Sequence, residues 1–316
     1  MPDREFTIQR ASSDDSATRT RPAMLAISGD SASGKTTLTK GLVQALGADR
    51  ITSMCVDDYH RYDRKERKSV PFTPLNPKCN YVAIMEQHLQ LVAMGQSILK
   101  PVYNHSGGTL DRPVLVEPSE YVIIEGLLPL YTKLARACFD VRVHLDPPEE
   151  LRHRWKIARD TSKRGYTEEE VLADLARREP ESAEFIRPQR AHADIVVRFA
   201  NIEERGESSD DPPSATILLR PTIAHPNLSE VITDDTRKAL HLKLIRDEDG
   251  KPVDALHIHG YAPSELSRQL EQAIWASLGG DQPVPESLGV IEPGVRSEPL
   301  ALTQLILLYH LIQARR

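Results

Sequence analysis

Short apolar runs alternate with helix-like patterns between about residue 22 and residue 200. This alternation is typical of an α/β protein with a mostly parallel sheet, because each buried strand is followed by a helix that crosses back over the sheet. A helix is predicted over Lys35–Leu46, and Gly47 is its stop signal. The runs that predict strands are 24–28, 51–56, 121–124, 141–145 and 194–199.

The pattern changes after an acidic stretch that ends in two prolines. Leucines at 240, 242 and 244 alternate with polar residues, and Asp249–Gly250 separates them from a second apolar run over 253–258. A period of two with a turn between the runs predicts an antiparallel hairpin. Helices are predicted over 264–278, with Ser264 as N-cap, and over 300–316, as an amphipathic helix. The predicted organisation is a flexible tail (1–21), an α/β core (22–200), a linker (201–213) and a hairpin-and-helix C-terminal region (214–316).

Composition excludes several classes of protein. The 46 acidic and 40 basic residues give a net charge of -6, whereas a nucleic-acid-binding surface would be basic. No apolar run approaches the roughly 20 residues of a membrane helix, and residues 1–21 contain no apolar signal core. We therefore expect a cytoplasmic protein that binds neither nucleic acid nor membrane. The three cysteines are too few and too scattered for a disulfide framework, so reduced thiols are expected.

The segment Gly29–Thr36, GDSASGKT, fits the pattern G-x-x-x-x-G-K-[ST] directly after a predicted strand and at the start of a helix. Backbone N–H groups and the helix N-terminus surround phosphates in such a loop, the lysine contacts the β- and γ-phosphates, and the threonine hydroxyl binds Mg²⁺. A chance glycine turn before a helix is the alternative, and the context disfavours it. The motif does not distinguish a kinase from an ATPase, a GTPase or a switch. The predicted ATP-binding residues are Gly29, Asp30, Ser31, Ala32, Ser33, Gly34, Lys35, Thr36 and Thr37.

Charged residues follow the second and third predicted strands. Phosphoryl transfer to a hydroxyl needs a carboxylate near the acceptor oxygen and cations that neutralise the moving group. Asp57 is the predicted general base, and His60 and Arg64 lie close enough in sequence to bind an anionic acceptor. Glu125, at the end of the third strand, is predicted to serve the metal. The alternatives are a solvated charged loop for the first group and a surface acid for Glu125.

A basic helix follows the fourth strand. Lys156, Arg159 and Lys163 occupy positions i, i+3 and i+7, so they are predicted to share one helical face. Such a face beside a phosphate loop suits a lid that closes over the triphosphate and stabilises transition-state charge. The alternative is a solvated helix whose cations are balanced by the nearby glutamates.

Six blocks together resemble the phosphoribulokinase family, most closely the type found in plants, cyanobacteria and archaea. They are GDSASGKTT, CVDDYHRYDR, KPVYNH, VIIEGLLPLY, WKIARDTSKRGYT and IRPQRAHADIVV, and they keep their order from about residue 24 to residue 200. The resemblance is much looser after that. It implies a P-loop kinase fold, ATP and Mg²⁺ as cofactors, a sugar phosphate as acceptor, a homodimer, and a place in the Calvin cycle.

The resemblance also implies roles for individual residues. Asp57 takes the proton from the C1 hydroxyl of ribulose 5-phosphate, Tyr103 and His105 line the sugar pocket, and Arg164 replaces Lys163 in the lid. The sheet edge near 193–199, or the second region, is expected to form the dimer interface. The remaining implied roles are Lys35, Arg159 and Arg164 in transfer; His60, Arg64, Lys156 and Asp160 in acceptor binding; and Thr36 and Glu125 at the metal.

The phosphate loop departs from the plant enzyme at one position, and a group of histidines lies outside the segment that resembles the family. Ser33 occupies a loop position where the plant enzyme has a cysteine, so the light-dependent disulfide with the position of Cys55 cannot form. Cys55 is therefore predicted to be a small buried residue rather than a redox switch. His241, His257 and His259 lie close together on the predicted hairpin, but no cysteine or carboxylate completes a metal set there.

Three functions remain in competition from the sequence. The leading hypothesis is an ATP-dependent phosphoribulokinase that produces ribulose 1,5-bisphosphate. A uridine kinase-like enzyme, or another sugar-phosphate kinase of the same superfamily, is the second, although a neutral nucleoside would leave His60, Arg64 and the lid arginines unpaired. A non-catalytic nucleotide-binding switch is the third, and the presence of both Asp57 and Glu125 argues against it.

Overall fold

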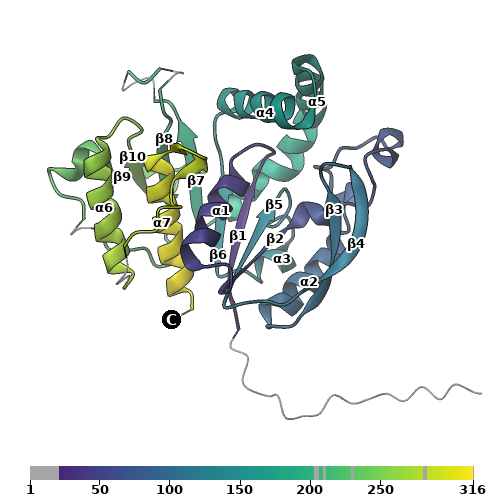
Figure 1. Ribbon diagram of the computed structural model, residues 1–316, viewed down its shortest axis with the longest axis horizontal. Coiled ribbons are helices and arrows are strands. Elements are labelled where there is room, and N and C mark those ends of the chain that lie inside the picture. Colours follow the sequence, from purple (N-terminus) through teal and green to yellow (C-terminus); the bar gives the residue numbers. More distant parts are fainter. Residues whose placement is uncertain (1–20, 203–205, 209–210, 229–230, 280–282, 316) are drawn as a thin grey trace, which may run out of the picture.

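The computed structural model describes residues 21–202, 206–208, 211–228, 231–279 and 283–315, so nearly all of the predicted tail, 1–21, lies outside the described residues. Its centre is an eight-stranded sheet in the order β2-β5-β1-β6-β7-β8-β10-β9 (Figure 1). Within this sheet, the strands β2, β5, β1, β6 and β7 run parallel. The remaining three continue the same sheet in antiparallel fashion. The bounds are β1 Ala23–Gly29, β2 Ile51–Cys55, β5 Tyr121–Gly126, β6 Val141–Leu145, β7 Ile195–Ala200, β8 Ser214–Leu219, β9 Leu240–Arg246 and β10 Pro252–Ile258.

The predicted α/β class and the parallel strands are confirmed, and the first predicted helix has the predicted bounds. The division at 201–213 stays a prediction, although the sheet itself continues from β7 to β8 across that segment. The helices are α1 Lys35–Leu46, α2 Val82–Ala93, α3 Lys133–Arg136, α4 Glu149–Arg164, α5 Glu168–Glu181, α6 Ser264–Ser277 and α7 Glu298–Gln313.

Helices cover both faces of the parallel strands, because successive side chains of a strand point to opposite faces. On β1, Leu25 and Ile27 pack in the core formed with α1, α6 and α7. Met24 and Ala26 of the same strand pack against α2 and α3 on the other face. This double burial explains the continuous apolar run that predicted β1. The α4–α5 pair stands above the carboxyl end of the sheet, with the β3–β4 hairpin on one side and α6 and α7 on the other (Figure 1).

Two sequence predictions about helices are wrong. The last helix is not amphipathic: α7 is buried on nearly all sides, including the polar side chains of Thr303 and Gln304. It lies between α1 and α6, so it has no wide face left for water. For α6, the N-cap residue is Pro263 rather than Ser264. None of the helices in the described ranges combines the length and the apolar character needed to span a bilayer.

The sheet also corrects one of the two predicted interfaces, while the one in the second region stays a prediction. β7 lies between β6 and β8, so residues 193–199 form no sheet edge. The edges of the sheet are β2 and β9. The sequence missed a separate two-stranded hairpin, β3 (Ile98–Asn104) with β4 (Thr109–Val116), which packs beside the turn that follows β2. A second small pair consists of β11 (Val290–Glu292) and β12 (Val295–Arg296).

Candidate active site

The phosphate loop connects β1 to α1 at the carboxyl end of the sheet. Ala32 and Gly34 adopt left-handed backbone angles, with φ of 65° and 97°, which close the loop before the helix begins. The Lys35 ammonium is buried and donates to the backbone carbonyls of Gly29, at 2.9 Å, and Asp30, at 2.7 Å. The loop therefore surrounds a fixed positive charge, and the N-terminus of α1 adds its own partial charge.

Thr36 and Glu125 meet beside this loop. The register of β1 and β5 places Ile27 opposite Glu125, and the Thr36 hydroxyl donates to a Glu125 carboxylate oxygen at 3.3 Å. Burial raises the pKa of Glu125 to about 6, with Lys35 acting in the opposite direction. Hydroxyl and carboxylate oxygens suit Mg²⁺, which usually takes one or two protein ligands beside phosphates and water. Within the described residues, no group of three or more His, Cys, Asp or Glu side chains forms a self-sufficient metal site.

The two aspartates after β2 face in different directions. Both lie in a 3₁₀ turn, Val56–Tyr59. Asp57 accepts a hydrogen bond from the backbone N–H of Leu127, at 3.0 Å, and so sits against the end of β5 beside Glu125. Asp58 accepts from the backbone N–H of Tyr103, at 2.9 Å, and forms an ion pair with Lys100, so it holds the β3–β4 hairpin.

Aromatic rings form a wall behind Asp57. The centroids of His60 and Tyr103 are 4.9 Å apart, and those of Tyr103 and His105 are 5.0 Å apart, both edge to face. Burial lowers the pKa of His60 to about 4, so the ring is neutral near pH 7. Arg64 donates to the backbone carbonyl of His105 at 2.6 Å, which places its guanidinium at the turn of the hairpin.

Arg67 is a wall residue that sequence reasoning missed. Its guanidinium lies 4.7 Å from the Tyr103 ring centroid and also donates to the Tyr103 hydroxyl. It is one of the charges that lower the pKa of both His60 and His105, whose main cause is burial. The sequence signal was present, because Arg67 lies in the same basic run as Arg64.

The predicted lid residues gather around one carboxylate. Asp160 is within 2.8 Å of Lys156, 2.8 Å of Arg159 and 3.3 Å of Arg164. Lys156 is buried, and it also donates to Asp174 of α5 at 3.1 Å. α4 runs to Arg164, so Lys163 is helical and keeps the predicted spacing from Lys156 and Arg159. The residue at the end of the helix that pairs with Asp160 is Arg164, the position that the resemblance implied.

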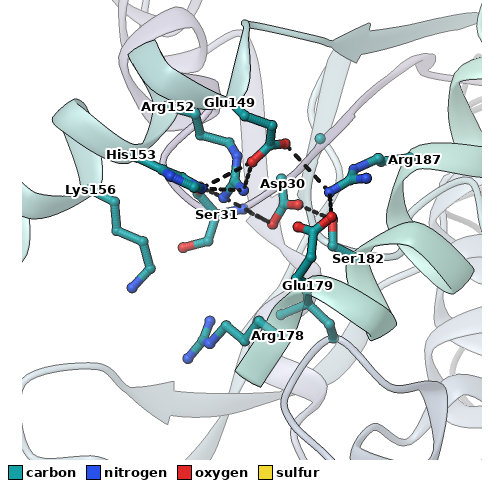
Figure 2. Close-up of polar contacts among 12 residues, drawn as sticks. Asp30, Ser31, Glu149, Arg152, His153, Lys156, Arg178, Glu179, Ser182 and Arg187 are labelled. Carbon is teal, nitrogen blue, oxygen red and sulfur yellow. Dashed lines mark hydrogen bonds and ion pairs between the residues drawn. The ribbon is translucent and has the colours of Figure 1, made fainter. Parts of the chain in front are cut away.

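The same helix pair contacts the phosphate loop. Figure 2 shows Asp30 between Arg152 of α4, 3.6 Å away, and Ser182, whose hydroxyl donates to the other Asp30 oxygen. The Arg159 guanidinium lies 3.4 Å from the Ser31 hydroxyl. The cations of α4 thus already lie next to the loop that would hold the triphosphate.

The cysteines and the hairpin histidines can now be placed. Cys55, Cys79 and Cys138 are free thiols, and burial raises the pKa of Cys55 well above its ordinary value. A thiol held protonated in this way is a poor nucleophile. On the hairpin, the rings of His241 and His259 stack, with a nitrogen-to-nitrogen hydrogen bond of 2.9 Å.

The fold and the site define a P-loop nucleotide-binding protein with an acid after each of two neighbouring strands. A family model described as Phosphoribulokinase / Uridine kinase family matches residues 24–204, and the chain belongs to that family. Phosphoribulokinase of Synechocystis sp. is 42% identical over 178 residues, covering 56% of this chain and 54% of the relative. Chloroplastic phosphoribulokinase of Spinacia oleracea is 33% identical over 197 residues, covering 57% of this chain and 49% of the relative.

The chain therefore spans about half the length of the curated relatives it matches. Among solved structures, phosphoribulokinase from Rhodobacter spheroides aligns with a TM-score of 0.58 and 18% identity. The alignment covers 85% of this chain and 99% of that chain. At this identity the likeness shows a shared fold, and it includes strands beyond the matched family segment.

Proposed function

We propose that this protein is an ATP-dependent phosphoribulokinase, which transfers the γ-phosphoryl group of ATP to the C1 hydroxyl of D-ribulose 5-phosphate. One observation carries the proposal: the charge of Asp57 acts on the pKa of Glu125, which accepts from Thr36 of the phosphate loop, and also on the pKa values of His60 and His105 in the wall. A hydroxyl bound against this wall has a carboxylate beside it and faces the end of the triphosphate. In-line transfer needs this order of groups.

On the nucleotide side, Lys35 and the loop N–H groups hold the β- and γ-phosphates. Lys35 leaves the loop carbonyls of Gly29 and Asp30 when a phosphate offers it a stronger partner. Thr36 and Glu125 would hold Mg²⁺, which neutralises charge on the β- and γ-oxygens when bound. Arg159 and Arg164 stabilise the charge that develops on the phosphoryl group as it moves.

On the acceptor side, Asp57 accepts the hydroxyl proton. His60 is neutral, and its Nδ1–H donates to Asn80, so Nε2 is left as an acceptor for a sugar hydroxyl. Arg64 and Arg67 bind the phosphate of the acceptor. Lys156 and Asp160 hold the arginines of the lid in place. These guanidinium groups favour an already phosphorylated acceptor over a neutral nucleoside.

The test measures ATP consumption with ribulose 5-phosphate, ribose 5-phosphate and uridine. Turnover with ribulose 5-phosphate at a kcat/KM at least a hundredfold above the other two supports the proposal. Turnover with uridine alone would assign the protein to the uridine kinase branch of the family, and binding of ATP without any turnover would favour a switch. The family resemblance also leads us to propose a homodimer, which light scattering of the purified protein tests.

A further inference from the structure

The end of α5 departs from regular helix geometry. Pro180 lies in its last turn and cannot donate a backbone hydrogen bond, and a π-helical turn, Ser182–Ile186, follows directly. Single π-turns within helices frequently mark functional sites, because they change the direction of the side chains around them. Here the adjacent residues Glu181 and Ser182 contact two different parts of the candidate site.

Ser182 contacts the nucleotide side. Its side chain is buried and donates to Asp30, as the dashed line in Figure 2 shows. The other oxygen of Asp30 accepts from the backbone N–H of Ser31 at 2.7 Å, and the Asp30 carbonyl accepts from Lys35. Ser182 therefore supports the part of the phosphate loop that surrounds the catalytic lysine.

Glu181 contacts the acceptor side. One carboxylate oxygen accepts from the backbone N–H of Thr73, at 2.9 Å, and from the Thr73 hydroxyl. The other accepts from the side-chain amide of Asn76 at 3.0 Å. Three donors converge on this one carboxylate, more than 100 residues away in the sequence. We call residues 73–80 the acceptor segment, because its last residue, Asn80, contacts His60.

Asn80 makes that connection. Its amide nitrogen donates to the carbonyls of Pro74, at 3.0 Å, and Asn76, at 2.9 Å, so its oxygen is the atom that faces His60. That oxygen lies 2.6 Å from His60 Nδ1 and must accept from it. The contact fixes the tautomer with the proton on Nδ1, and no described residue donates to Nε2. The orientation and the accepting nitrogen of His60 thus depend on the acceptor segment.

We propose that Glu181 and Ser182 are positioning residues that hold the acceptor segment and the phosphate loop in a fixed relation, with Glu181 acting on the acceptor through Asn80 and His60. The inference rests on the proposed function, in that it takes His60 as an acceptor-binding residue. Because the two residues are adjacent, a displacement of the end of α5 would move both the acceptor segment and the phosphate loop. Each residue should nevertheless affect mainly its own side, because its hydrogen bonds go to that side alone.

The experiment compares Glu181→Gln with Glu179→Gln. Glutamine keeps the size of Glu181 but turns one acceptor into a donor, which then opposes Thr73 or Asn76. Glu179 lies on the same helix, is exposed, and contacts Arg187 rather than the acceptor segment, so it is the matched control. Glu181→Gln should raise the KM for the acceptor about tenfold and change the KM for ATP less than twofold. The control, Glu179→Gln, should change neither KM. Ser182→Ala should instead raise the KM for ATP and leave the KM for the acceptor nearly unchanged.

A second readout does not depend on turnover. Histidine-labelled protein should give His60 ring ¹⁵N signals of a neutral Nδ1–H tautomer, assigned by their loss in His60→Gln. Glu181→Gln should move them toward a mixture of tautomers, and Glu179→Gln should not. Asn76→Asp is a second variant, since it keeps the oxygen that caps Lys78 and replaces the amide donor with a carboxylate oxygen that opposes Glu181.

Unchanged His60 signals in both acceptor-side variants would overturn the inference. So would a rise of both KM values by the same factor, which indicates general loosening. If the parent has no activity with ribulose 5-phosphate but phosphorylates another acceptor, the KM comparison is made with that acceptor and only the proposed substrate fails. If it has no activity at all, the ring signals decide alone.

Discussion

Gly41→Ala tests how closely the C-terminal helix packs on the helix of the phosphate loop. Gly41 lies in the middle of α1, facing α7, and a Cβ built on it would be 2.0 Å from the side-chain nitrogen of Gln304 and 2.6 Å from its oxygen. Both separations are far inside van der Waals contact. Gln304 is fully buried and cannot move out to water, so the extra methyl group must displace its amide.

The magnitude follows from what that amide contacts. Its oxygen accepts from the backbone N–H of Gly289, at 2.7 Å, and its nitrogen donates to the carbonyl of Leu38 at 3.2 Å. Alanine gains about 1 kcal/mol of helix propensity over glycine. Against this, overpacking costs about 1–3 kcal/mol, and each buried polar group left without a partner costs about 1–3 kcal/mol. With one buried polar group left without a partner, these terms give a net destabilisation of about 1–5 kcal/mol.

Urea denaturation of the parent, Gly41→Ala, Gln304→Ala and the double variant measures this. Truncating Gln304 removes the obstructing amide, so the double variant should be more stable than the two single effects predict, by about 1–2 kcal/mol. A Gly41→Ala protein as stable as the parent, within about 0.5 kcal/mol, would refute the reasoning. So would strict additivity in the double variant, because it would mean that the two residues do not touch.

Three further predictions concern the site and its surroundings. Asp57→Asn should lower kcat by about 10²–10⁴ while calorimetry still detects ATP binding; a near-normal kcat would remove the general-base role. Burial lowers the pKa of His144 to about 3, so the folded protein keeps this ring neutral and loses stability as the pH falls below about 6.5. His144→Gln should therefore reduce the pH dependence of the unfolding free energy between pH 6 and 4 by up to about 1.4 kcal/mol per pH unit, measured by urea denaturation; an unchanged slope contradicts the neutral ring. Cys55→Ser should leave activity as insensitive to mild oxidants as the parent, since the half-buried thiol is held protonated by its raised pKa and Ser33 offers no partner; a reversible loss of parent activity, restored by thiol, would show otherwise.

The parallel strands and the phosphate loop could be predicted because their signals are local. β1 and β5 are buried on both faces, so their positions are apolar or small except Glu125 near the end of β5, and the runs stand out in the sequence. α1 begins at the lysine of the loop and ends where Gly47 adopts a positive φ of 91°. These signals occupy neighbouring positions and need no knowledge of distant residues.

The hairpin β3–β4 and the neighbours of α7 could not be predicted in the same way. β4 is almost entirely exposed, so it has no apolar alternation to indicate a strand. α7 is apolar around its whole circumference, and its first polar interior residue, Thr303, satisfies its hydroxyl within the helix by donating to the Pro299 carbonyl. A pattern of this kind indicates a buried helix, but it does not indicate that α1 and α6 are the helices that cover it.

The site shows the same limit at the level of single side chains. From sequence, Asp57 was predicted as the general base by its place at the strand end, and no role was predicted for the adjacent Asp58. In the structure the 3₁₀ turn directs Asp57 to β5 and Asp58 to the hairpin. His60 was predicted as a partner for an anion, whereas its burial makes it neutral and gives it an accepting nitrogen.

Under the proposed function, a neutral His60 changes which groups of the acceptor site recognise which part of the acceptor. A ring that cannot carry charge near pH 7 contributes little to binding a phosphate, so the guanidinium groups of Arg64 and Arg67 must supply that charge. An accepting nitrogen held by Asn80 instead selects for a hydroxyl at one position, because an acceptor lacking that hydroxyl leaves Nε2 buried without a donor. Charge at one end and hydroxyl geometry at the other together describe a phosphorylated sugar, which neither group would specify alone.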